Sequence, residues 1–226
     1  MLTSTVTIYT ESTPNPHSMK FVFNVELLPE GMSFDYTQPA DGLTKEKNSP
    51  LAVALFGFEF VRRVFITNNF ITLTKTENAA WEDELFGIKQ YLKKCFAEKQ
   101  PVFSLPASEF AAEGDSSDSE IIIQIKQVLE EYVKPAVEMD GGAIQFKSFK
   151  DGKVNLALQG SCSGCPSSMI TLKAGIEGMM KRMIPEVKEV VAEAEEVRSP
   201  HNFHLTVMAR FGVPLFCLWL FWLFLL

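Results

Sequence analysis

The first part of the chain predicts two strands and the start of a helix. Residues 5–10 (TVTIYT) and 20–24 (KFVFN) alternate apolar and polar positions with the period of a half-buried strand. The TPNP tetrapeptide between them, residues 13–16, predicts a turn. Ser49 precedes Pro50 and the apolar run LAVALF, which is the pattern of an N-cap with proline at the first helical position.

Two more strands and a longer helix follow. Residues 64–67 (VFIT) and 70–75 (FITLTK) flank an Asn-Asn pair, which predicts a hairpin turn because asparagine tolerates a positive φ. Apolar residues then recur at the spacing of one helix face: Trp81, Leu85, Ile88, Leu92 and Phe96. We therefore expect a small α/β domain over residues 1–99. Residues 100–118 lose this periodicity and are rich in Pro, Ser and acidic residues, which predicts a flexible linker.

Residues 119–198 predict a second domain in the order helix, strand, strand, helix, strand. The first helix has an apolar face over residues 121–133, and Pro135 should kink or end it. AIQFKSF and VNLALQ alternate like strands around an Asp-Gly hairpin turn. After the loop GSCSGCP come a helix that ends before Pro185 and a weaker, acidic strand. The expected fold class is α+β, with two small α/β-type domains joined by the linker.

The composition of the chain limits the cellular compartments and the binding partners that we expect. The chain has 226 residues, a formal net charge of −7 and only four cysteines. The acidic balance argues against nucleic-acid binding, and four cysteines are too few for a disulfide-stapled secreted fold of this size. The start of the sequence has neither the apolar core of a signal peptide nor an Arg-rich transit peptide. We expect a cytoplasmic, bacterial-type protein, with a mitochondrial or plastid location as the alternative.

Cys162 and Cys165 are the residues with the clearest chemistry. They lie between a predicted buried strand and a predicted helix, and Pro166 suits the first helical position. The positive end of the helix dipole stabilises a thiolate there, which is the form that binds metal. Small neighbours between and beside the cysteines let backbone amides donate hydrogen bonds to sulfur. The pair is therefore predicted to bind a metal or a cluster.

The number of available ligands suggests that two chains share the site. Zinc and iron–sulfur sites usually need about four protein ligands, and this domain offers two thiolates. Cys95 lies beside the stripe of the longer helix and is interpreted as a small core residue. The histidines, His17, His201 and His204, show no ligand spacing with the pair, and Asp140 is a weak candidate. A cluster on the two-fold axis of a homodimer, with Cys162 and Cys165 from each chain, satisfies the count.

Two other interpretations of the pair stay open. A CxxC motif at a helix start also occurs in dithiol–disulfide oxidoreductases, although there it usually encloses proline within a βαβ pattern. A structural zinc site shared by two chains would use the same sulfurs. Beyond the pair, the sequence shows no nucleophile–base constellation and no phosphate-binding loop, so we do not expect an enzyme.

The second domain resembles the C-terminal domain of NifU-like (Nfu-type) iron–sulfur scaffold proteins. The resemblance rests on DGGAIQF, on the Asp-Gly hairpin and on GSCSGCPSS before a helix, over about residues 120–197. TESTPNPHSMKF and the segments LAVALF and VFITNNFITLTK resemble the family's N-terminal domain. The resemblance implies a scaffold or carrier that holds a cluster, [4Fe–4S] in preference to [2Fe–2S], at Cys162 and Cys165 of a homodimer. It also implies delivery of that cluster to apo-proteins.

The tail, residues 199–226, has no counterpart in this resemblance. Residues 211–226 (FGVPLFCLWLFWLFLL) carry no charge, and this run is shorter than the about 20 residues of a full membrane span. The tail is a membrane anchor, a segment packed on the protein, or the product of a wrong reading frame. We prefer the last two, so membrane association is expected only through residues 211–226. Cys217 within this run is interpreted as an apolar residue rather than a ligand.

Overall fold

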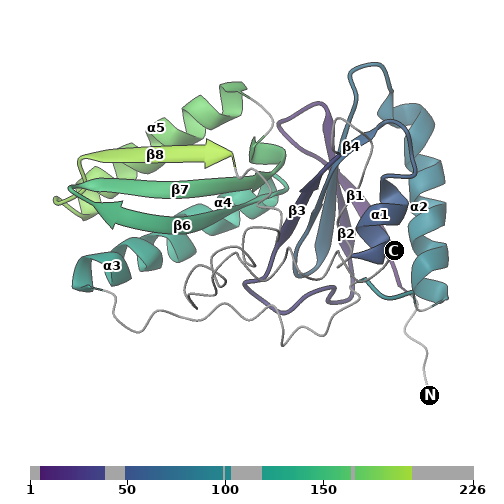
Figure 1. Ribbon diagram of the computed structural model, residues 1–226, viewed down its shortest axis with the longest axis horizontal. Helices are drawn as coiled ribbons and strands as arrows, with labels where there is room; N and C mark the ends of the chain where they lie inside the picture. Colours follow the sequence, from purple (N-terminus) through teal and green to yellow (C-terminus); the bar gives the residue numbers. More distant parts are fainter. Residues whose placement is uncertain (1–5, 39–48, 99, 103–118, 164–165, 195–226) are drawn as a thin grey trace, which may run out of the picture. The chain divides into compact units, whose positions relative to one another are not determined.

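An antiparallel sheet in the order β1-β2-β5-β4-β3 forms the first half of the fold (Figure 1). The computed structural model describes residues 6–38, 49–98, 100–102, 119–163 and 166–194. Most of the predicted linker, the whole predicted tail with Cys217, and Cys165 lie outside these ranges. The strands of the first sheet are β1 (Ile8–Ser12), β2 (Ser18–Phe23), β3 (Phe34–Thr37), β4 (Val61–Ile66) and β5 (Phe70–Lys75).

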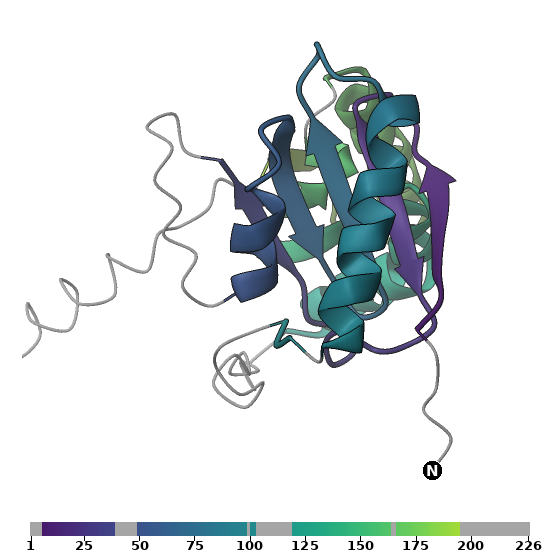
Figure 2. The same ribbon diagram turned by 90° about the vertical axis from the view of Figure 1, so that its right-hand side faces the viewer.

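Four of these strands and both helices of the first half were predicted. Helix α1 (Pro50–Leu55) begins as expected, because the Ser49 hydroxyl accepts a hydrogen bond from the backbone N–H of Ala52 at 3.1 Å. Helix α2 (Trp81–Ala97) lies on the same side of the sheet as α1 (Figure 2). The predicted first strand is displaced toward the C-terminus, to Ile8–Ser12.

The short edge strand β3 was missed. It contributes four residues, FDYT, and pairs with β4 in the register Tyr36↔Val64. Only one buried aromatic residue, Tyr36, marks this segment, which is too short a signal for a period of two. The strand matters for the site described below, because it places Asp35 beside Arg63.

The second sheet has the order β6-β7-β8 and was predicted strand by strand. Strands β6 (Gly142–Lys150) and β7 (Lys153–Gly160) are antiparallel, and β8 (Glu189–Ala194) runs parallel to β7. Asp151 and Gly152 both have positive φ, 54° and 85°, as the expected tight hairpin turn requires. Helix α5 (Pro166–Met183) connects β7 to β8, since parallel neighbours need a crossover.

The first helix of this half does not end at Pro135. Helix α3 (Glu120–Val128) continues into a π-helical turn (Leu129–Val133) and then into α4 (Lys134–Met139), with the proline in the first turn of α4. The wider π-turn accommodates the proline, which has no N–H to donate. The prediction of an end at this position was wrong, and the prediction of a local distortion was right.

Each sheet has a hydrophobic core of its own. In the first core, α1 and α2 pack on the first sheet. In the second core, α3, the π-helical turn, α4 and α5 pack on β7 and β8. The described residues of both halves nevertheless fall into one compact unit. The α+β fold class is confirmed, and the domain boundaries at residues 99 and 119 stay a prediction. Within the described ranges, no helix is long and apolar enough to cross a membrane.

The second core is testable with two isoleucines of α3. Ile125 is completely buried, whereas Ile123 is 56% exposed. Ile125→Ala should lower the free energy of unfolding by about 2–5 kcal/mol, since it removes buried methyl groups and leaves a cavity. Ile123→Ala is the matched control and should change it by no more than about 0.5 kcal/mol. Urea denaturation of both variants measures the difference, and equal effects would show that α3 does not pack as described.

Candidate functional site

Cys162 lies where the sequence predicted it, in the connection from β7 to α5. Strand β7 ends at Gly160, a single 3₁₀ turn covers Ser161–Ser163, and α5 begins at Pro166. The Cys162 side chain is only 4% exposed and belongs to the second core. The strand-to-helix loop is therefore present, but the Cys162 thiol points into the protein. The arrangement of Cys165 beside it stays a prediction, because Cys165 is outside the described residues.

Gly142 makes room for this thiol, and Gly160 lets the chain turn beside it. Gly142 and Gly160 are paired across the end of the β6–β7 ladder. A Cβ atom on Gly142 would lie 2.8 Å from the Cys162 Sγ and 2.6 Å from the Gln159 carbonyl oxygen. Gly160 has a φ of 66°, and a Cβ atom there would meet the Gly141 carbonyl oxygen at 2.7 Å. The close approach of the thiol to Gly142 was not predicted from the sequence.

Hydrogen bonds from the second half hold the loop that we call the cysteine loop, residues 160–163. The Ser161 backbone N–H donates to the Gly141 carbonyl at 3.3 Å, and the Ser161 hydroxyl donates to the Asp140 carbonyl. The Ser163 hydroxyl donates to the Gly160 carbonyl at 2.9 Å. Asp140 thus supports the loop through its backbone, and none of these contacts favours its carboxylate as a ligand.

Three side chains of the first half also bind the cysteine loop. The Gly160 backbone N–H donates to an Asp35 carboxylate oxygen at 2.6 Å, and the Arg63 guanidinium donates to the Ser163 hydroxyl. Asp35 and Arg63 form an ion pair with each other, at 3.0 Å. The Asn15 side-chain amide donates to the Ser161 carbonyl at 3.3 Å. The sequence did not predict these three residues, which all come from the other predicted domain.

Among the described residues, Cys95 does not lie near Cys162 as a further ligand. Cys95 is 3% exposed within the first core, on α2, which agrees with its interpretation as a core residue. Burial raises the pKa of the neighbouring Tyr91 to about 12, and the hydrogen bond between Tyr91 and Cys95 adds to this shift. His201 and His204 lie outside the described residues. In the part of the chain that the structure describes, no three His, Cys, Asp or Glu side chains come together as a metal site.

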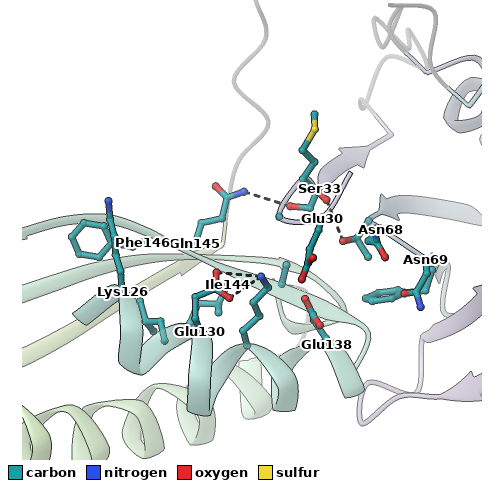
Figure 3. Close-up of a pocket in the computed structure, with 17 residues that line it drawn as sticks. Glu30, Ser33, Asn68, Asn69, Lys126, Glu130, Glu138, Ile144, Gln145 and Phe146 are labelled. Carbon is teal, nitrogen blue, oxygen red and sulfur yellow. Dashed lines mark hydrogen bonds and ion pairs between the residues drawn. The ribbon is translucent and has the colours of Figure 1, made fainter. Parts of the chain in front are cut away.

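A separate cavity of about 580 Å³ lies between the turn that joins β4 to β5 and the helices of the second half. Figure 3 shows Asn68 and Asn69 on one side and Lys126 and Glu130 on the other. Burial raises the pKa of Glu138, which also lines this cavity, while the charge of Lys134 opposes the rise. Cys162 is not among its lining residues, so the cavity and the cysteine loop are distinct sites.

Family models match both halves of the chain. The model described as "NifU-like domain" matches residues 125–191, and "Scaffold protein Nfu/NifU N terminal" matches residues 8–99. Together the two matches span more than half of the chain. The chain belongs to the Nfu-type NifU family. The match to the first model covers Cys162 and Cys165, and the match to the second covers Asn15, Asp35 and Arg63.

Curated Nfu-type relatives extend this similarity over most of the chain. The "NFU1 iron-sulfur cluster scaffold homolog, mitochondrial" of Drosophila grimshawi is 39% identical over 198 residues, which are 86% of this chain and 64% of that protein. Its namesake in Drosophila willistoni is 40% identical over 189 residues, which are 82% of this chain and 63% of that protein. The chain thus spans slightly less than two thirds of these relatives. Their printed names do not support the cytoplasmic expectation.

A solved structure of the family matches a part of the Nfu-type chain. The solution NMR structure of a NifU-like protein from Saccharomyces cerevisiae is 23% identical, with a TM-score of 0.40. It corresponds to 47% of this chain and 92% of that protein.

Substitution of Gly142 tests the contact with Cys162. Gly142→Ala should lower the free energy of unfolding by about 1–3 kcal/mol, because its Cβ has no space beside the Cys162 Sγ and the Gln159 carbonyl. Gly175→Ala is the matched control, since a Cβ on this exposed glycine of α5 has no atom within 4 Å. It should raise the free energy of unfolding by about 0.5–1 kcal/mol. Thermal denaturation measures both, and a neutral Gly142→Ala would contradict the close approach.

Proposed function

We propose that this chain is an iron–sulfur cluster scaffold and carrier, which holds a cluster between two subunits and delivers it to apo-proteins. Cys162 and Cys165 of each subunit supply the four thiolates. The observation that carries the proposal is the position of Cys162 in a small-residue loop directly before α5, in a chain of the Nfu-type family. The scaffold role printed in the names of the curated relatives supports it.

The residues around Cys162 suit a sulfur-rich cargo. Gly142 offers no side chain, so a sulfur atom can approach the backbone closely there. The start of an 18-residue helix supplies N–H groups and a positive dipole end, which favour thiolates over thiols. Hydrogen bonds from backbone amides to cluster sulfurs are a common means of tuning such sites. We propose a [4Fe–4S] cluster in preference to [2Fe–2S].

The colour and iron content of the protein distinguish this proposal from the two alternatives. Anaerobically reconstituted protein should be brown and contain iron and sulfide in fixed proportion to the subunit dimer. Absorption and Mössbauer spectroscopy would then identify the cluster type. A dithiol oxidoreductase or a zinc-bridged dimer would be colourless, and the latter would contain zinc at one ion per two chains.

We also propose a mitochondrial location, because both curated relatives carry that word in their names. A fluorescent fusion of the full coding sequence, viewed against an organelle marker, tests this. Diffuse cytosolic fluorescence would contradict this proposal and support the cytoplasmic location that we expected from the sequence.

Replacement of the cysteines tests the cluster ligands. The Cys162→Ser, Cys165→Ser double variant should bind no cluster, because each subunit then lacks both of its thiolates. Cys95→Ser is the control and should keep the cluster, since Cys95 is buried in the other core. Iron and sulfide analysis after anaerobic reconstitution measures all three proteins. Normal cluster content in the double variant would exclude the proposed ligands.

A fragment tests the proposed domain boundaries. We propose that residues 119–198 form a cluster-binding domain with its own core and that residues 1–99 form a separate docking or recognition domain. A fragment of residues 117–198 should then fold, dimerise and take up a cluster, as circular dichroism, sedimentation and iron analysis would show. An unfolded fragment would show that the second core depends on the first half of the chain.

A further inference from the structure

The two charged side chains that contact the cysteine loop are almost completely shielded from solvent. The side chains of Asp35 and Arg63 are 3% and 12% exposed. They lie on the adjacent antiparallel strands β3 and β4, and the register Thr37↔Arg63 makes them diagonal neighbours on one face of the sheet. Burial of an ion pair carries a desolvation cost that is offset only when the remaining hydrogen-bonding capacity is also used. Here the remaining oxygen of Asp35 and an N–H group of Arg63 form hydrogen bonds with residues of the second half of the chain.

The Asp35–Arg63 ion pair contacts residues on both sides of Cys162. Asp35 accepts from the Gly160 N–H, and Arg63 donates to the Ser163 hydroxyl. Asn15 adds a hydrogen bond to the Ser161 carbonyl, and its own side-chain oxygen is fixed by the His17 N–H at 3.0 Å. These contacts involve backbone groups or a hydroxyl at three of the four positions of the cysteine loop. A surface of the first half therefore recognises the conformation of the loop itself.

Apolar contacts support the same arrangement. A Cβ atom on Gly160 would lie 2.9 Å from the ring of Phe65, and one on Gly141 would lie 3.0 Å from side-chain atoms of Thr13 and Thr72. Gly141 and Gly160, the neighbours of the Gly142 that accommodates the thiol, thus allow the first half to approach the loop closely. Cys162 itself is 4% exposed and packs in the second core, and the surface of the first half contacts the residues on both sides of it.

We propose that Asp35, Arg63 and Asn15 form an intramolecular docking surface for the cysteine loop, which shields Cys162 in the unloaded chain and must be released before loading. The second part of this proposal rests on the function proposed above, because a cluster shared by two subunits needs Cys162 at the surface. Docking and loading therefore exclude each other.

The rate of thiol alkylation tests the docking surface without any cluster. The full-length, reduced, metal-free chain is treated with a maleimide, and peptide mass spectrometry follows Cys162 and Cys95 separately. In the unsubstituted protein both should react slowly, because both are buried. Asp35→Asn and Arg63→Lys should each accelerate Cys162 by about tenfold, the change expected for the loss of a hydrogen bond to a charged group.

Arg63→Lys keeps the positive charge opposite Asp35, so that the first half retains an ion pair, but an ammonium cannot reproduce the fork of the guanidinium. An unchanged Cys95 rate shows in the same experiment that the first core is intact. Glu11→Gln is the control, since it removes an ion pair between the half-exposed Glu11 and the buried Lys20 on the same sheet, away from the hydrogen bonds to the cysteine loop. It should leave the Cys162 rate unaltered.

Two results would overturn the proposal. One is fast alkylation of Cys162 in the unsubstituted protein, at the rate measured in denaturant. The other is an unaltered Cys162 rate in both Asp35→Asn and Arg63→Lys. Since no iron is present, neither result depends on cluster binding. The iron content of the Cys162→Ser, Cys165→Ser double variant tests the scaffold function separately.

Discussion

The pairing of Gly142 with Gly160 at the end of the β6–β7 ladder is the constraint on which the site depends. It brings two backbones together without side chains, so that the chain can turn at Gly160 and place Cys162 against β6. The same lack of side chains admits Phe65 from the other half of the protein. One steric condition therefore determines both the direction of the thiol and the approach of Phe65 to the cysteine loop.

The elements near the cysteines could be predicted because their signals are local. The Asp151-Gly152 turn requires two successive positive φ values, and few other sequences supply them. Pro166 and the apolar spacing after it predicted the start of α5. By contrast, β3 has only four residues, and the π-turn before Pro135 is a response of the whole helix to one missing N–H. Neither leaves a periodic signal in the sequence.

The covering of the cysteine loop could not be predicted, because it depends on contacts between distant residues. Asn15, Asp35 and Arg63 contact partners that are 146, 125 and 100 positions away. Asn15 belongs to the TPNP segment, which its sequence indicated only as a turn. An asparagine side chain often bonds to its own local backbone, as the bond from the His17 N–H shows. Its second bond, to Ser161, needs the three-dimensional structure.

The intramolecular nature of the docking explains why a few polar contacts suffice. Two surfaces on one chain meet at a high effective concentration, so even a weak interface is well populated. Under the proposed function, a second subunit that offers its own Cys162 and Cys165 competes for the loop only as an intermolecular partner, and it gains the advantage when a cluster joins the two. In this proposal, the balance between the internal contact and the shared cluster controls loading.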